Sequence, residues 1–148
     1  MKKSFLIVLL IIPLIAACST IVLQPVNFGW AIENVLTSDA NGMVEEQRHA
    51  ISFNITPLFQ AEFGDSVKAD SKEIRIICST DGFYFVTSKT FKNVYVLAPA
   101  ENSLKVDNKI LINEQGLLSP VFNQRDTHIE LIDGANIYKL TSKGITVK

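Results

Sequence analysis

The sequence predicts an all-β domain, an antiparallel sandwich or a small barrel built from hairpins. The 148-residue chain is 47% apolar and 20% charged, so it has the material for a core and is not intrinsically disordered. Short apolar runs recur at intervals of about 8 to 12 residues with turn residues between them. No long segment has the 3.6-residue period that helices of an α/β fold would show.

The first two predicted strands are residues 30–37 and 50–55, and we expect them to pair as a hairpin. Between them, Asp39-Ala40-Asn41-Gly42 is a turn cluster. It lacks the alternating oxygen ligands and the closing glutamate of a calcium loop. Residues 43–49 have helix-favouring side chains but strand-favouring neighbours, so we interpret them as the polar continuation of the second strand.

Pro57 is expected to end regular strand pairing or to place the preceding strand at a sheet edge. Residues 58–63 then suit one short helical turn, and residues 64–72 read as a polar loop.

The second half of the chain predicts more hairpins. The clearest joins residues 73–80 to residues 83–88 around Asp81-Gly82, which suits a two-residue type I′ turn. The remaining predicted strands are Lys92–Leu97 bounded by Pro99, Leu104–Asn113 with a turn near Asp107-Asn108, Gly116–Phe122, a last hairpin of His128–Ile132 and Asn136–Thr141 around Asp133-Gly134, and an edge at Ile145–Val147.

The amino terminus carries the most specific motif in the chain. Met1-Lys2-Lys3 is positively charged, residues 5–15 are apolar apart from Pro13, and Ala16-Ala17-Cys18 follows. This segment resembles a bacterial lipoprotein signal peptide, and Ile15-Ala16-Ala17-Cys18 resembles its lipobox. The resemblance implies cleavage before Cys18, a thioether-linked diacylglycerol on its sulfur and an acylated new amino group. Two or three acyl chains anchor a protein stably, whereas one chain is marginal.

The chain therefore divides into a signal peptide at residues 1–17, a lipidated tether at residues 18–29 and a single all-β domain at residues 30–148. Ser19 after the cysteine implies the outer membrane rather than the inner one. Two alternatives are an uncleaved transmembrane anchor over residues 5–23 and a plain secretory signal with a soluble product. All three place the domain outside the cytoplasm, in or beyond the cell envelope.

Charge and cysteine content limit the binding partners and the disulfide bonds that the sequence predicts. The net charge is −1 and the basic residues of the second half of the chain stand singly, so nucleic acid is not expected as a partner. If Cys18 is acylated, Cys78 has no cysteine with which to pair inside the chain. Its apolar neighbours predict a buried core thiol.

No motif predicts catalysis, a metal or another cofactor. The chain has no Gly-x-Ser-x-Gly or Cys-His signature, and its glycines form no phosphate-binding loop. The histidines, His49 and His128, fall on separate predicted strands without zinc-motif spacing. The neighbours Glu45 and Glu46 would point to opposite faces of a strand, so they do not form a catalytic pair.

Aromatic residues are the remaining candidates for binding. Phe28, Trp30 and Tyr84 are our candidate contact residues, and Tyr84 would be one only if its face of the strand is open. We expect a non-catalytic binding or assembly module with an envelope protein as partner. The alternative is a carrier or sensor that holds a small apolar ligand or lipid in a barrel pocket. An envelope enzyme or inhibitor would need clustered polar groups that the sequence does not display.

Overall fold

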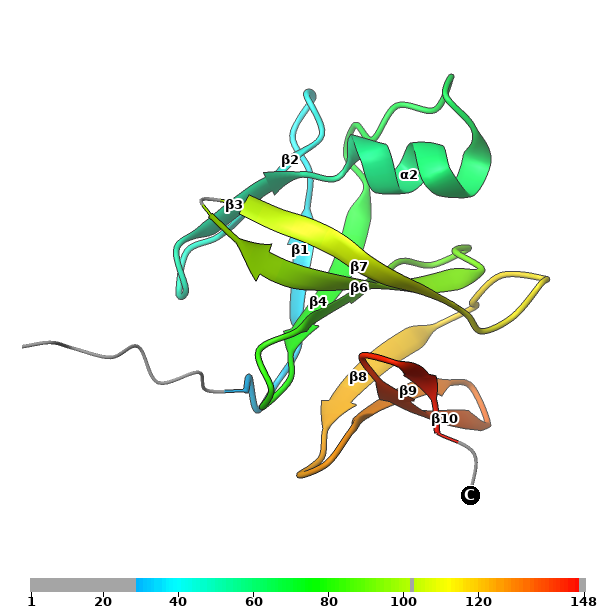
Figure 1. The fold of residues 1–148 in the computed structure, drawn as a ribbon. Helices are drawn as coiled ribbons and strands as arrows, with labels where there is room; N and C mark the ends of the chain where they lie inside the picture. The colour runs from blue at the N-terminus through cyan, green and yellow to red at the C-terminus, as the bar shows by residue number, and fades with distance from the viewer. Residues whose placement is uncertain (1–28, 102, 147–148) are drawn as a thin grey trace, which may run out of the picture.

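The computed structural model describes residues 29–101 and 103–146. Eleven strands and one helix occur within these ranges, and every strand pair is antiparallel, so the all-β prediction is confirmed. The sheets are open in the described part of the chain, which makes the architecture a sandwich rather than a closed barrel (Figure 1). The predicted signal peptide, Cys18 and Phe28 lie outside the described residues.

The larger sheet has five strands in the order β1-β4-β5-β6-β7. Their bounds are Asn34–Thr37, Glu73–Cys78, Tyr84–Thr87, Asn93–Ala100 and Ser103–Leu111. The three middle strands are rich in β-branched and aromatic side chains and are buried on both faces. β5 is therefore the central strand, with both of its faces covered.

The second sheet has four strands in the order β11-β10-β9-β8. Their bounds are Gly144–Ile145, Asn136–Thr141, Ile129–Asp133 and Pro120–Gln124. Burial alternates along β9, where Ile129 and Leu131 are fully buried and Glu130 and Ile132 are partly exposed. This sheet therefore has one face in the core and one face directed outward.

A two-stranded sheet of β2 (Met43–Glu46) and β3 (Ile51–Asn54) is followed by the helix α2 (Thr56–Phe63). Pro57 lies in the first turn of this helix, where its missing N–H is harmless, and Gly64 ends the helix with φ +98°. The predicted helical turn and the polar loop at residues 64–72 are confirmed.

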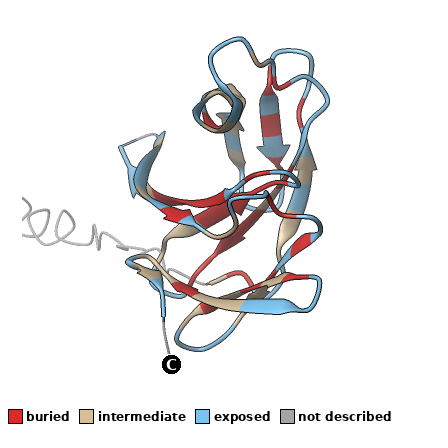
Figure 2. Cartoon of the chain, turned by 90° about the vertical axis from the view of Figure 1, so that its right-hand side faces the viewer, coloured by how far each residue is buried: buried red, intermediate tan, exposed pale blue. Residues whose placement is uncertain are grey.

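The five-stranded sheet lies between two covering layers. On one face, α2 packs through Phe59 onto Phe91, and its Glu62 accepts a hydrogen bond of 2.9 Å from the Tyr95 hydroxyl. On the other face, Phe85 and Ile129 of the four-stranded sheet border a hollow between the two sheets. Buried residues concentrate where the layers meet (Figure 2).

Two predictions about the first strands are wrong. β1 pairs with β4 rather than with the run that contains β3, because a strand's apolar pattern does not identify its partner. Residues 43–49 are not a continuation of that run either. They contain β2 and the start of a turn at residues 47–50, which lets β2 fold back onto β3.

The predicted hairpin of β4 and β5 is confirmed, but its turn differs from the prediction. The loop has three residues, Thr80 to Gly82, because Ser79 donates its N–H to the carbonyl of Phe83. Only Gly82 has a positive φ, of +85°. Asp81 is therefore not in the left-handed conformation that a type I′ turn requires, and the geometry is that of a type I turn with a glycine bulge.

Strand β7 runs without a break past Asp107-Asn108, so the turn predicted there is wrong. Val96 faces Asn108 while its neighbour Leu97 faces Val106, which leaves Asp107 as the extra residue of a β-bulge. β6 also continues through Pro99, which pairs with Leu104 of β7 beyond the last residue that β5 contacts. The last hairpin, β9 with β10, is confirmed. The edge predicted at Ile145–Val147 overlaps β11 at Ile145, and Val147 lies outside the described residues.

Candidate functional site

Two of the three aromatic residues singled out from the sequence meet in space. Trp30 and Tyr84 make an edge contact with ring centroids 5.5 Å apart. Trp30 is 7% exposed and stacks on His49 at 4.2 Å, with the ring planes 16° apart. Trp30 therefore lies beneath the turn between β2 and β3. Of these two aromatic residues, Tyr84 is the partly buried one, with part of its side chain at the surface.

Glu46 holds His49 in this position. Its carboxylate accepts hydrogen bonds from the His49 backbone N–H at 2.6 Å and from Nδ1 at 2.8 Å. Burial alone would raise the pKa of Glu46, but these bonds outweigh it, so the pKa lies below its ordinary value. The cluster is a satisfied structural contact, and nothing in the sequence marked Glu46 and His49 as its members.

Cys78 and Tyr84 lie side by side next to the loop that joins β4 to β5. Cys78 is buried, as the sequence predicts, and burial raises the pKa of its thiol. Burial also raises the pKa of the Tyr84 hydroxyl, with the neighbouring sulfur adding to the effect. A protonated, shielded thiol is a poor nucleophile, so this pair suits packing rather than catalysis.

The outward face of the four-stranded sheet carries an apolar row. Ile132 of β9 is directly opposite Val121 of β8 on one side and Ile137 of β10 on the other. Val121 and Ile137 are 37% and 61% exposed. Ile32 is 74% exposed and forms a bridge with Asn123, one diagonal step from Val121. These four residues, Ile32, Val121, Ile132 and Ile137, are called the apolar row below.

Polar residues border the apolar row. The Glu130 carboxylate forms an ion pair with the Arg125 guanidinium, with oxygen and nitrogen 2.8 Å apart. Glu130 also lies directly opposite Lys139 in the pairing of β9 with β10. Beyond them, a hollow of about 360 Å³ is bordered by Thr127, His128, Lys139, Thr141 and Thr146. The outward face thus combines an apolar centre with a charged and hydroxylated margin.

The sequence analysis missed the apolar row, although a signal was present. A half-buried strand alternates apolar and polar residues, yet Leu131 and Ile132 are consecutive apolar residues in β9. Ile137 likewise occupies an exposed position in β10. Apolar side chains at positions that alternation assigns to solvent indicate an exposed patch.

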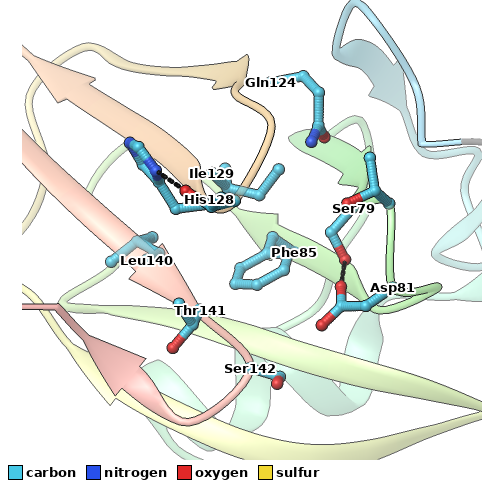
Figure 3. Close-up of a pocket in the computed structure, with 11 residues that line it drawn as sticks. Ser79, Asp81, Phe85, Gln124, His128, Ile129, Leu140, Thr141 and Ser142 are labelled. Atoms are coloured by element: carbon cyan, nitrogen blue, oxygen red, sulfur yellow. Dashed lines mark hydrogen bonds between the residues drawn. The ribbon is translucent and has the colours of Figure 1, made fainter.

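A second hollow, of about 130 Å³, lies between the sheets. Figure 3 shows Phe85 at the centre of this hollow. Ser79 and Asp81, from the connection between β4 and β5, lie on one side, and Leu140 of the four-stranded sheet lies on the other. Ser79 donates a hydrogen bond to Asp81. His128 interacts with Thr127 at 3.1 Å rather than with Ser79, so these residues do not form a catalytic triad.

Metal ligands do not converge in the part of the chain that the structure describes, where no three His, Cys, Asp or Glu side chains form a suitable group. Among these same residues, no helix has the length and apolar character to cross a membrane.

Comparison of the chain with known protein families, with curated proteins and with solved structures gives no match.

Proposed function

We propose that this chain is a lipid-anchored protein of the bacterial envelope and acts as a non-catalytic binding or assembly module. In this proposal a protein partner docks on the outward face of the four-stranded sheet. The apolar row, with Ile137 61% exposed at its end, is the observation that carries it. Contiguous exposed apolar side chains on a folded domain mark interaction sites more often than chance.

The margin of the apolar row supports a protein partner. Protein interfaces have an apolar centre that is shielded from water and a polar rim that remains hydrated. Glu130, Arg125 and Lys139 provide such a rim on the side of the hollow. Mixed charges of this kind give orientation and specificity to docking.

The anchor is supported by the sequence of the amino terminus. Ile15-Ala16-Ala17-Cys18 resembles the lipobox, with Ile15 where Leu is commoner, and Ser19 suits delivery to the outer membrane. A lipid on Cys18 would confine the module to a membrane surface, which raises its effective concentration toward an envelope partner. Cys18→Ala is expected to move the protein from the membrane fraction to the soluble fraction. Unchanged membrane association would contradict lipidation and favour an uncleaved anchor.

A carrier of an apolar ligand has less support. The two hollows between and beside the sheets have volumes of about 130 and 360 Å³, and polar side chains contribute to both linings. An apolar ligand would leave these polar groups without hydrogen bonds, which opposes its binding.

The docking proposal is tested by co-purification from bacterial membranes. Ile137→Asp places a charge within the apolar row and is expected to abolish recovery of the partner. Val106→Asp is the matched control, because Val106 is 48% exposed but lies on the other sheet. Equal recovery with both variants, or no stoichiometric protein with the natural chain, would contradict a docking site at the apolar row.

A further inference from the structure

We propose that the hollow of about 360 Å³ beside the apolar row is a subsite for a carboxylate group of the docking partner, with Lys139 as its anchor. The occupant is an acidic side chain that enters the hollow while its neighbours cover the apolar row. This inference rests on the proposed function, because it names the chemistry that the partner brings to the outward face.

The hollow is open to an incoming side chain. Thr127 and Thr146 at its border are exposed, and His128, Lys139 and Thr141 are half-buried. Its volume lies near the lower end of the range for ligand pockets, which is about 300 to 1,000 Å³. It therefore suits a small group, such as one side chain, rather than a large cofactor.

The charges around the hollow favour an anion. Lys139 is at the border, and none of the described residues there is Asp or Glu. Glu130 lies directly opposite Lys139 in the strand pairing, but its carboxylate is paired with Nε and Nη2 of Arg125, each at 2.8 Å. The Lys139 ammonium forms no ion pair with any described residue. Its positive charge is therefore left for a ligand to neutralise.

A carboxylate matches this site better than a phosphate group. The pair of Glu130 and Arg125 is neutral, so Lys139 leaves one positive charge, and a carboxylate carries one negative charge, whereas a phosphate monoester carries about 1.5 to 2 at pH 7. Thr141 already donates its hydroxyl to the Gly144 carbonyl at 3.3 Å. The exposed hydroxyl of Thr146 is the better placed donor for a carboxylate oxygen.

The hollow and the apolar row share one face of β10. Ile137 and Lys139 are two residues apart in this strand, so their side chains point to the same side, about 6.5 Å apart along the strand. Residues two positions apart in any extended segment have the same spacing. The partner is therefore expected to present an aliphatic residue and an acidic residue two positions apart.

The test is a two-dimensional NMR titration of the full chain in nonionic detergent with blocked tripeptides. The probes are N-acetyl-Leu-Gly-Glu-amide and its Gln and Lys counterparts, with inorganic phosphate as a second anion. The Glu peptide should shift the methyl signals of Thr127, Thr141 and Thr146 in a saturable way. It should bind about fivefold more tightly than the Gln peptide, the effect expected of one ion pair near the surface.

Two variants assign this preference to Lys139. Lys139→Met should reduce the affinity for the Glu peptide to that for the Gln peptide. Lys89→Met is the matched control and should leave the preference unchanged, because Lys89 is exposed and lies outside the hollow. Salt provides a measurement that needs no variant, since 0.5 M NaCl should remove the preference by screening the ion pair.

The outcomes separate this inference from docking itself. Equal binding of the Glu and Gln peptides, an unchanged preference in Lys139→Met, no saturable binding, or equal shifts with phosphate would overturn the carboxylate subsite. Loss of the partner in Ile137→Asp alongside any of these results would leave docking at the apolar row intact. A preference for the Glu peptide without a recoverable partner would instead contradict the proposed function alone.

Discussion

The indole of Trp30 stacks on the imidazole of His49 with ring centroids 4.2 Å apart, which ties the start of the described chain to the turn between β2 and β3. Tyr84 of the central strand contacts the same indole from its edge. Three segments distant in sequence therefore share one aromatic contact.

Trp30→Ala is expected to lower the free energy of unfolding by about 3 to 5 kcal/mol, because a large buried aromatic ring is replaced by a cavity. Urea denaturation followed by circular dichroism measures this, since the variant loses the only tryptophan. Phe63→Ala is the control, because Phe63 is 43% exposed and its loss should have a smaller effect. A Trp30→Ala protein as stable as the natural chain would refute the buried position of Trp30.

The ionisation of Glu46 should make the free energy of unfolding depend on pH. Its folded pKa lies below the ordinary value of 4.5, so its contribution is fully present above that pH and is lost as the pH falls through the lowered folded value. The difference in unfolding free energy between the natural chain and Glu46→Gln should therefore shrink between pH 7 and pH 3. Glu45→Gln, on the exposed face of the same strand, is the control. A difference that is constant over this range would contradict the lowered pKa.

Glu33 links the two sheets. Its carboxylate accepts hydrogen bonds from the Arg75 guanidinium of β4 and from the Phe122 N–H of β8, the latter at 2.9 Å. Glu33→Ala is expected to lower the free energy of unfolding by about 2 to 4 kcal/mol, because the guanidinium and the amide both lose their acceptor. Glu73→Ala should have little effect, since Glu73 is exposed and approaches Arg75 only at 3.8 Å. Similar losses in the two variants would argue against the linking role.

The number of reactive thiols tests both the burial of Cys78 and the modification of Cys18. Burial raises the pKa of its sulfur, so the folded protein should react slowly with a thiol reagent and the denatured protein quickly. If the sulfur of Cys18 is held in a thioether, as proposed, the denatured protein purified from membranes should contain one reactive thiol per chain. Two equivalents would show that Cys18 is unmodified.

The sequence predicted the strands better than their partners. Turn chemistry is local, so Asp81-Gly82 and Asp133-Gly134 located two hairpins correctly. The pairing of β1 with β4 depends on contacts between residues 36 to 42 positions apart, such as Asn34 with Ile76, and no local pattern encodes it. At Asp107-Asn108 the same turn-forming residues serve a bulge instead.

The candidate surfaces were only partly foreseeable. The sequence predicted Trp30 and Tyr84 as contact residues, and this stays a prediction, whereas their mutual contact and the cover that His49 provides arise from tertiary packing. The apolar row depends on the register that aligns Val121, Ile132 and Ile137 across three strands.

Photo-cross-linking in living bacteria tests the central claim most directly, with a photoreactive amino acid at Ile137 of the otherwise natural chain and, in parallel, at Val106. The proposed function predicts one abundant envelope protein cross-linked from position 137 and absent from position 106. An identical set of cross-linked proteins at the two positions, or none at position 137, would contradict docking on the outward face of the four-stranded sheet.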